Sequence, residues 1–195
     1  MAHAGELERR VEALEERLRV AEDLLAIERL KARYGELVDR CYGPGGVVSR
    51  PELERLADQI ADLFTEDAVW DGGQSLGRFE GREAIRGRFL EPRTSFAFHL
   101  FVSPRIEVTG DRASGSWRVL APCTVGRERA YWMAGIERDE YRRVGGAWRH
   151  SRMELATVLF APYERGWARR PRREGETGAG GIVKEEQKSG VRGDR

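Results

Sequence analysis

Three side chains in the first hundred residues form a candidate set for acid–base catalysis. Tyr34 and Asp39 lie five residues apart in LKARYGELVD (Leu30–Asp39), and His99 lies in the alternating run TSFAFHLFVSPRIEV. Five residues turn a helix by about 500°, which would place Tyr34 and Asp39 roughly 140° apart beside a cavity mouth. An imidazole is a suitable general base near neutral pH when a carboxylate fixes its tautomer. A phenol can donate to a departing hydroxyl group or to a developing oxyanion. The three residue types predict base catalysis by His99, supported by Asp39 and Tyr34, with no metal or organic cofactor.

Each of these residues also has a purely structural interpretation. Asp39 could cap its helix or pair with Arg33 or Arg40, as carboxylates near helix ends commonly do. His99 on an apolar strand could be a satisfied core residue, and Tyr34 could be a packing aromatic with its hydroxyl at the surface. The relative positions of the three side chains decide between these interpretations.

The composition is that of one soluble domain with charged extensions. The chain has 195 residues, 40% of them hydrophobic and 34% charged, and its net charge is +1. Such a balance gives no overall field that would attract nucleic acid or an anionic membrane. No apolar run approaches the roughly 20 residues that span a bilayer, and the N-terminus lacks a signal-peptide pattern. We expect a cytoplasmic protein with no nucleic-acid or membrane partner, in which Cys41 and Cys123 are inert thiols.

The first 25 residues carry the spacing of a coiled coil. Apolar residues recur alternately every four and three positions over about three heptads. A stripe this narrow needs a partner helix, so we expect residues 1–25 to form an arm that joins copies of the chain into a dimer or trimer. The alternative is that the arm folds back along its own domain, because three heptads are marginal alone. The stripe consists of Leu7, Val11, Leu14, Leu18, Ala21 and Leu25.

Residues 26–90 predict further helices. The helix continues or restarts over residues 26–41, and a glycine-rich loop follows it. Ser49 and Pro51 are typical of the start of a second helix, which would end near Phe64. A short strand is expected near residues 65–70, and a third helix over residues 81–90 ends before Pro92.

From residue 94 the hydrophobic pattern changes to a period of two, which predicts a sheet. The order of helices first and strands afterwards indicates an α+β domain over residues 26–168, with helices on one face of a strongly curved antiparallel sheet. Residues 169–195 are rich in Gly, Arg and Glu and are expected to form a disordered charged tail. The four long strands are expected at residues 94–109, 112–125, 129–144 and 147–160.

Several segments together carry a family pattern. They are RYxxxxD in the early helix, LFTEDAVW, GREAI, a histidine on a long strand, and DEYRRVGGAWRHSRMEL. This pattern, over about residues 26–157, resembles the SnoaL-like family of the nuclear-transport-factor-2-like superfamily, which includes scytalone dehydratase, bile-acid 7α-dehydratase and hexachlorocyclohexane dehydrochlorinase. The resemblance implies a cone-shaped sheet around a pocket, a scaffold that carries many different reactions.

The resemblance also implies roles for individual residues. In the lyases of this family an aspartate on the first helix supports a histidine on the sheet that removes a proton, and Asp39 and His99 fall at these positions. Tyr34 falls where the dehydratases carry a tyrosine and the dehydrochlorinase carries a lysine. Met153 aligns with an arginine of the dehydrochlorinase, so halide elimination is not expected. The closer match is a dehydratase-like site.

Alternation along the strands, carried through the resemblance, predicts an apolar, nearly charge-free pocket with one imidazole in it. Alternate residues share a face, so Ala97 and Phe101 point inward if His99 does. The expected inner face also includes Cys123, Gly135, Ser151 and Leu155. The opposite face of the last strand, with Trp148, His150, Arg152 and Glu154, is expected to face outward or toward another subunit. The expected substrate-binding residues are Trp70, for which a core role is the alternative, Ala97, Phe101, Trp117, Val119, Ala121, Tyr131, Met133, Met153 and Thr157.

The sequence therefore predicts a cofactor-independent lyase, a dehydratase acting on a hydrophobic polycyclic or aromatic molecule such as a steroid or polyketide. One alternative is an isomerase or polyketide cyclase that uses the same base without loss of water. The other is a non-catalytic protein that binds small molecules in the same pocket.

Overall fold

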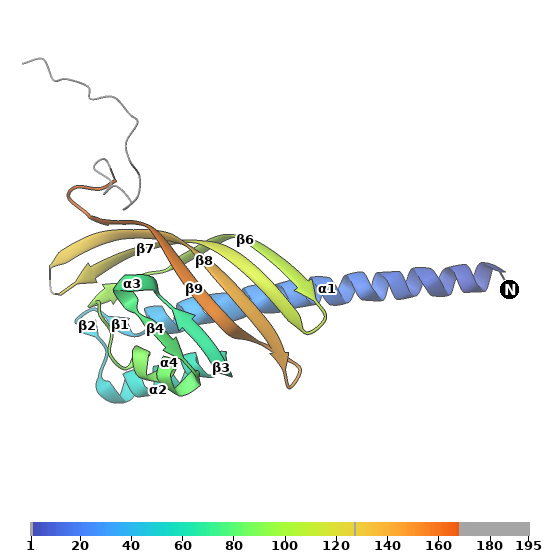
Figure 1. Ribbon diagram of the computed structural model, residues 1–195, viewed down its shortest axis with the longest axis horizontal. Helices are drawn as coiled ribbons and strands as arrows, with labels where there is room; N and C mark the ends of the chain where they lie inside the picture. Colours follow the sequence, from blue (N-terminus) through green and yellow to red (C-terminus); the bar gives the residue numbers. More distant parts are fainter. Residues whose placement is uncertain (1, 127, 168–195) are drawn as a thin grey trace, which may run out of the picture.

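The computed structural model describes residues 2–126 and 128–167, and the tail expected at 169–195 lies outside them. Helices come first and long strands afterwards, as Figure 1 shows. The helices are α1 (Ala2–Asp39), α2 (Arg50–Ala61), α3 (Gly73–Leu76) and α4 (Arg82–Phe89). The strands are β1 (Tyr42–Gly43), β2 (Gly46–Val47), β3 (Phe64–Asp71), β4 (Arg78–Glu80), β5 (Phe96–Ala97), β6 (Leu100–Thr109), β7 (Arg112–Val125), β8 (Arg129–Val144) and β9 (Ala147–Pro162).

The expected α+β cone is confirmed, with one addition to the sheet. Strands β5 to β9 form the antiparallel part of the sheet. Strand β3 lies parallel to β9 on one side and antiparallel to β4 on the other. The long strands arch over α1, while α2 and α4 lie together beside β3 and β4 (Figure 1). Apolar residues of α1, α2, β3 and α4 fill the space beneath the sheet. The curved sheet and the helices thus enclose this apolar core between them.

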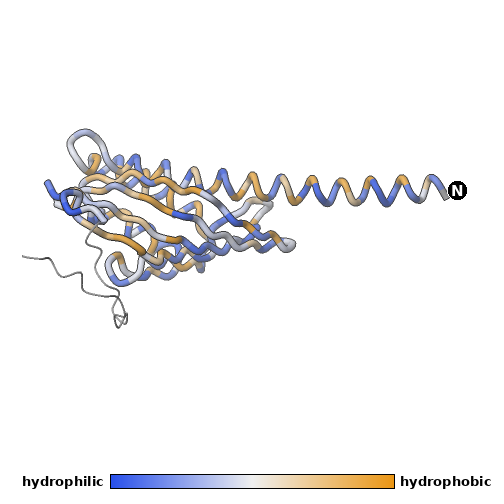
Figure 2. The backbone as a smooth tube through the Cα atoms, turned by 90° about the horizontal axis from the view of Figure 1, so that it is seen from above, coloured by the Kyte–Doolittle hydropathy of each residue, from blue (hydrophilic) through white to orange (hydrophobic). Residues whose placement is uncertain are grey.

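Helix α1 is continuous from the arm into the domain, and its two halves differ in burial. The arm projects beyond the edge of the sheet, so it does not fold back along the domain (Figure 1). Its seam is open to solvent: Leu14 and Leu18 are 58% and 59% exposed. Hydrophobic residues alternate with hydrophilic ones along the whole arm in Figure 2. From Ile27 onward the helix turns an apolar face toward the sheet.

The strand expected at 94–109 is interrupted at the position of His99. Strands β5 and β6 both pair with β7 in the same register, with Ala97 opposite Cys123 and Leu100 opposite Leu120. Together they form one edge of the sheet, so the backbone groups that point away from β7 have no strand partner. This edge is where the sheet meets the end of α1.

Two bulges in β9 overturn part of the expected alternation. Tyr141 pairs with His150 and Glu140 pairs with Arg152, so Ser151 is an extra residue in the ladder. A second shift leaves Val158 as an extra residue between the partners of Ala134 and Gly135. One extra residue moves every following side chain to the other face. His150 therefore points to the same side as Met153, and the expected outward orientation of Trp148 and His150 is wrong.

No helix among the described residues is long and apolar enough to cross a membrane, although α1 has the length.

Candidate active site

The Asp39 and His99 side chains, called the dyad below, are in direct contact. Asp39 Oδ1 lies 2.7 Å from His99 Nδ1, and the backbone amide of His99 donates to both Asp39 oxygens at 3.1 Å. Asp39 is the last residue of α1, and His99 lies between β5 and β6 at the sheet edge. The edge leaves the His99 amide free of a strand partner, and Asp39 supplies its acceptor. The alternative pairing of Asp39 with Arg33 or Arg40 is absent, because these arginines lie next to Glu36 and Glu52.

The dyad fixes which ring nitrogen of His99 is available for chemistry. A carboxylate only accepts hydrogen bonds, so a neutral imidazole must carry its proton on Nδ1, facing Asp39. The Nε2 atom is then the nitrogen that can accept a proton. Both side chains are 19% exposed, which leaves the pair accessible without being fully solvated.

Tyr34 lies in the wall of the same cavity as His99. Its hydroxyl oxygen accepts a hydrogen bond of 3.0 Å from Trp70 Nε1, and no described residue accepts its proton. Burial, and then the nearby charge of Glu137, raise the pKa of Tyr34 well above its ordinary value. The group therefore stays a neutral phenol that can donate a hydrogen bond into the cavity.

A cavity of about 310 Å³ lies between α1, α4 and the sheet, and it is mostly apolar. Such a volume is at the small end of ligand pockets, which span about 300–1,000 Å³. Of the residues expected from the sequence, Tyr34, Trp70, Ala97, His99, Ala121, Met133 and Thr157 line it. Asp39 does not, and lies behind His99. The wall is completed by residues of α1, β1, α3, α4, β9 and the loop after α4, including Val38, Tyr42, Leu76, Phe89, Thr94 and Phe160.

Five of the expected substrate-binding residues do not line this cavity. Phe101 stacks against His99, with ring centroids 5.9 Å apart, and faces a shallow groove that also contains Asp39 and Trp117. Val119 is buried in β7. Tyr131 stacks on Phe160, and Met153 is buried in the core beneath Trp70. Outside the bulged strand β9, alternation identified the inward face of the long strands, but the cavity occupies only part of it.

Two residues in the cavity wall correct the expectation of a nearly charge-free pocket. Arg88 of α4 and Arg93 beyond its end both line the cavity. The sequence contained a signal for Arg88, because it lies three residues after Ile85 and so belongs to the buried face of its helix. Cys41 and Cys123 also line the wall, and burial raises the pKa of the Cys41 thiol to about 11. Thiols of this kind are protonated near neutral pH and unreactive.

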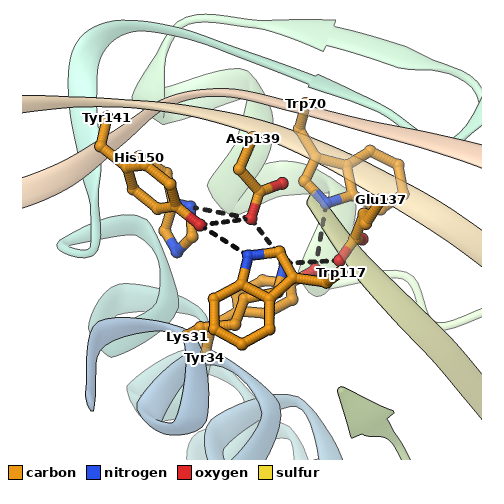
Figure 3. A network of polar contacts seen from close by, with 8 residues as sticks. All are labelled: Lys31, Tyr34, Trp70, Trp117, Glu137, Asp139, Tyr141 and His150. Carbon is orange, nitrogen blue, oxygen red and sulfur yellow. Dashed lines mark hydrogen bonds and ion pairs between the residues drawn. The ribbon is translucent and has the colours of Figure 1, made fainter. Parts of the chain in front are cut away.

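A second cluster of ionisable groups lies deeper under the sheet, and the sequence reasoning missed it. Lys31 of α1 is 1% exposed and donates to Glu137 and, at 2.8 Å, to Asp139. Tyr141 donates to Asp139 at 2.8 Å and accepts from Trp117 Nε1 at 2.9 Å. Figure 3 shows these groups converging from α1, β7 and β8, with the His150 ring beside them. We call Lys31, Trp117, Glu137, Asp139, Tyr141 and His150 the buried network.

Charge and burial oppose one another within the buried network. Burial alone would lower the pKa of the Lys31 ammonium, but Asp139 and Glu137 together hold it above its ordinary value. Burial raises the pKa of Asp139 to about 6, and the attraction of Lys31 only partly opposes this. The two carboxylates share one ammonium, so Glu137 also disfavours the charge on Asp139.

His150 is fully buried, which corrects its expected position at the surface and the expectation of a single inward imidazole. Its ring lies among Tyr34, Phe64 and Tyr141, with centroids 5.0 to 5.8 Å away. Burial, followed by the nearby Lys31 charge, lowers the pKa of His150 well below its ordinary value. His150 Nδ1 lies 3.8 Å from Asp139 Oδ2, too far for a hydrogen bond, so we treat His150 as a neutral buried ring.

The described residues contain no group of three or more His, Cys, Asp or Glu side chains placed to hold a metal ion. The titratable side chains in the cavity wall are His99, which Asp39 backs, together with Tyr34, Tyr42, Cys41, Cys123, Arg88 and Arg93.

Comparison with known proteins places this fold in a family. Residues 19–154 match the SnoaL-like domain family. A search of curated proteins finds no match. Among solved structures, a candidate aromatic ring hydroxylase from Novosphingobium aromaticivorans is 26% identical, with a TM-score of 0.60, and the alignment covers 73% of this chain and 94% of that one.

Two further structures show the same fold at lower identity. A hexachlorocyclohexane dehydrochlorinase from Novosphingobium barchaimii is 22% identical, with a TM-score of 0.61, and the alignment covers 75% of this chain and 93% of that one. A candidate scytalone dehydratase from N. aromaticivorans is 22% identical, with a TM-score of 0.60 and coverage of 73% and 89%. The family match spans well over half of the sequence and includes Tyr34, Asp39 and His99. The chain therefore belongs to the SnoaL-like domain family.

Proposed function

We propose that this protein is a cofactor-independent lyase, a dehydratase, in which His99 removes a proton from a substrate held in the cavity. The observation that carries the proposal is the 2.7 Å contact between Asp39 and His99 Nδ1, on a histidine that lines a mostly apolar cavity. A carboxylate in this position fixes the imidazole orientation and stabilises the imidazolium formed after proton transfer. The names of two structurally similar proteins, a dehydrochlorinase and a candidate dehydratase, support elimination chemistry.

The raised pKa of Tyr34 narrows its role in this reaction. A buried phenolate next to Glu137 would be strongly disfavoured, so complete proton transfer from Tyr34 is costly. Tyr34 is better suited to donating a hydrogen bond to the oxygen of the departing hydroxyl. The proton that His99 takes from carbon can then pass to that oxygen. The C–H and C–O bonds break, a C=C bond forms, and one water leaves without a net change in the protein.

The cavity volume supports a compact cyclic substrate. A space of about 310 Å³ suits a molecule of one or two rings. Apolar and aromatic side chains such as Trp70, Phe89 and Met133 make up most of the wall, so a hydrophobic aromatic molecule fits best.

The test is a panel of hydroxylated aromatic and alicyclic compounds incubated with the purified protein and followed by mass spectrometry. A dehydratase gives a product lighter by one water. An isomerase or cyclase gives a product of unchanged mass and different retention, whereas a binding protein gives none. Turnover should be lost in His99→Ala and kept in His3→Ala, which changes an exposed histidine of the arm. Turnover that persists in His99→Ala would contradict the assignment of the base.

We also propose that the arm joins copies of this chain into a homo-oligomer. Its seam residues are exposed and the arm projects clear of the domain, so nothing in the described part of the same chain covers them. Light scattering of the double variant Leu14→Glu/Leu18→Glu should give a smaller mass than the wild type. Arg17→Gln, which changes a residue outside the seam, should leave the mass unchanged. A wild-type monomer would refute this role.

A further inference from the structure

The cavity wall contains two guanidinium groups and, among the described residues, no carboxylate. Arg93 is exposed, and its Nη1 donates to the Ser75 carbonyl at 2.8 Å. Arg88 differs because it is only partly accessible and its Nε atom is buried with no hydrogen-bond partner. A charged group therefore faces the ligand space without being fully solvated.

Arg88 also lacks the close polar partner that each of the other two arginines of α4 has. Arg86, two residues earlier, pairs with Asp58, and Arg82 donates to the Phe64 carbonyl. Arg88 has no ion pair among the described residues, and its one hydrogen bond is a long contact of 3.4 Å to the Glu91 carbonyl. The other N–H donors of the guanidinium have no hydrogen-bond partner among the described residues.

Two aromatic rings hold the Arg88 guanidinium in place. Its central carbon lies 5.3 Å from the Trp70 ring centroid and 5.7 Å from that of Phe89. Cation–π contacts of this kind offset part of the desolvation of the cation but do not use its N–H donors. Burial lowers the pKa of Arg88, although an arginine stays charged near neutral pH. An anion in the cavity would supply the missing counter-charge.

We propose that Arg88 is the anion-binding residue of the cavity and that the natural ligand is an aromatic or alicyclic molecule bearing a carboxylate. The carboxylate accepts two hydrogen bonds from the guanidinium fork, and the ring system lies against the apolar wall. This inference deepens the proposed function, because it names a charged group on the molecule that His99 acts upon. The binding itself does not depend on catalysis.

The test measures binding of two probes that differ in charge. 2-Naphthoate and 2-naphthalenemethanol share a ring system, and only the first is an anion near pH 8. Isothermal titration of the full-length protein should show about 10- to 100-fold tighter binding of the naphthoate, the effect expected of a hydrogen bond to a charged group. In Arg88→Gln the ratio of the two dissociation constants should fall to nearly one, while the neutral alcohol binds as it does to the wild type.

The neutral alcohol also serves as the internal control, because its binding shows that the cavity of the variant is intact. Arg86→Gln is the matched variant: it removes one positive charge from the same helix but leaves the cavity wall unchanged, so the preference should persist. Equal binding of both probes by the wild type, or a preference that survives Arg88→Gln, would overturn the inference. So would loss of the preference in Arg86→Gln, which would indicate a general field and no specific contact.

The outcomes separate this inference from the proposed function. A naphthoate preference without turnover of any substrate keeps the anion site and counts against the lyase. Turnover of neutral substrates with no naphthoate preference keeps the lyase and removes the anion site. Failure of both probes to bind the wild type would contradict the anion site and the ligand cavity on which the lyase depends.

Discussion

Two groups of ionisable side chains contact the same helix and differ in their access to solvent. Lys31 and Asp39 are eight residues apart on α1, which corresponds to about 12 Å along the helix axis. The dyad at Asp39 is 19% exposed and borders the cavity, whereas Lys31 and Asp139 of the buried network are at most 1% exposed at their side chains. The ring of Phe101 lies between them: it stacks on His99, and the Lys31 ammonium lies 4.4 Å from its centroid.

The difference shows how burial assigns separate tasks to similar residue types. In the dyad, one carboxylate orients one base, and the other side of that base is left open to a ligand. In the buried network, one ammonium is shared by two carboxylates, and a tyrosine completes the shell around Asp139 (Figure 3). None of these groups lines the cavity, so their interactions are with one another inside the fold. We therefore expect changes at the dyad to affect activity and changes in the network to affect stability.

The largest expected effect is on activity, from His99→Asn. Asparagine can still hydrogen-bond to Asp39 but cannot act as a base, so turnover should fall by about 10²- to 10⁴-fold. The free energy of unfolding, measured by urea titration, should change by less than about 1 kcal/mol, because the side chain is partly exposed at a sheet edge. A large loss of stability with activity retained per folded molecule would reverse the contrast between the two regions.

Lys31→Met should have the opposite pattern. It keeps the apolar stem but leaves Glu137 and Asp139 buried without their shared cation, which should cost about 3–5 kcal/mol of unfolding free energy. Arg29→Met removes an exposed charge from the same helix and should change stability by about 0.5 kcal/mol or less. Urea unfolding of both variants measures the difference. Equal stabilities would show that the buried pairing contributes nothing net.

The sequence predicted the fold well because periodicity and turn chemistry are local signals. Helix spacing located α1, α2 and α4, and the change to a period of two located the long strands. The helix spacing also indicated that Lys31 is buried, because it lies on the same face as Ile27 and Tyr34. Likewise, Glu137 and Asp139 continue the inward alternation from Met133 along β8. These residues were missed because charged side chains are usually exposed, and here they are buried as partners of one another.

The position of His150 could not be obtained in the same way. Its orientation depends on the bulge at Ser151, and the residues around this bulge carry no glycine or proline that would signal it. The bulge lies where β9 pairs with β3 on one side and with β8 on the other, and the pairing of these strands is a long-range property. The contact between Asp39 and His99, 60 residues apart, is equally long-range: their chemistry made them candidate partners, and the family resemblance indicated that they meet.

The pH dependence of the network gives a test of intermediate size. The folded-state pKa of Asp139 is raised from 3.8 to about 6, so its favourable contribution is present below pH 3.8 and lost as the pH rises through about 6. Asp139→Asn mimics the protonated form. Relative to this variant, the wild type should lose up to about 3 kcal/mol of unfolding free energy between pH 4 and 7. If the wild type instead gains unfolding free energy relative to Asp139→Asn as the pH rises, the attraction of Lys31 dominates and lowers the pKa of Asp139.

The smallest expected effect has the opposite sign and comes from His150. Its folded-state pKa is lowered, so its contribution is present above pH 6.5 and is lost as the pH falls, because only the unfolded chain takes up a proton. Relative to His150→Phe, which preserves a ring among Tyr34, Phe64 and Tyr141, the wild type should lose unfolding free energy as the pH falls from 6.5 to 5, by at most about 1.4 kcal/mol per pH unit. Urea titrations across this range provide the measurement. If the wild type instead gained stability on acidification, His150 would be binding a proton and pairing with Asp139. The buried network would then take up a proton in the folded state, as the dyad is proposed to do.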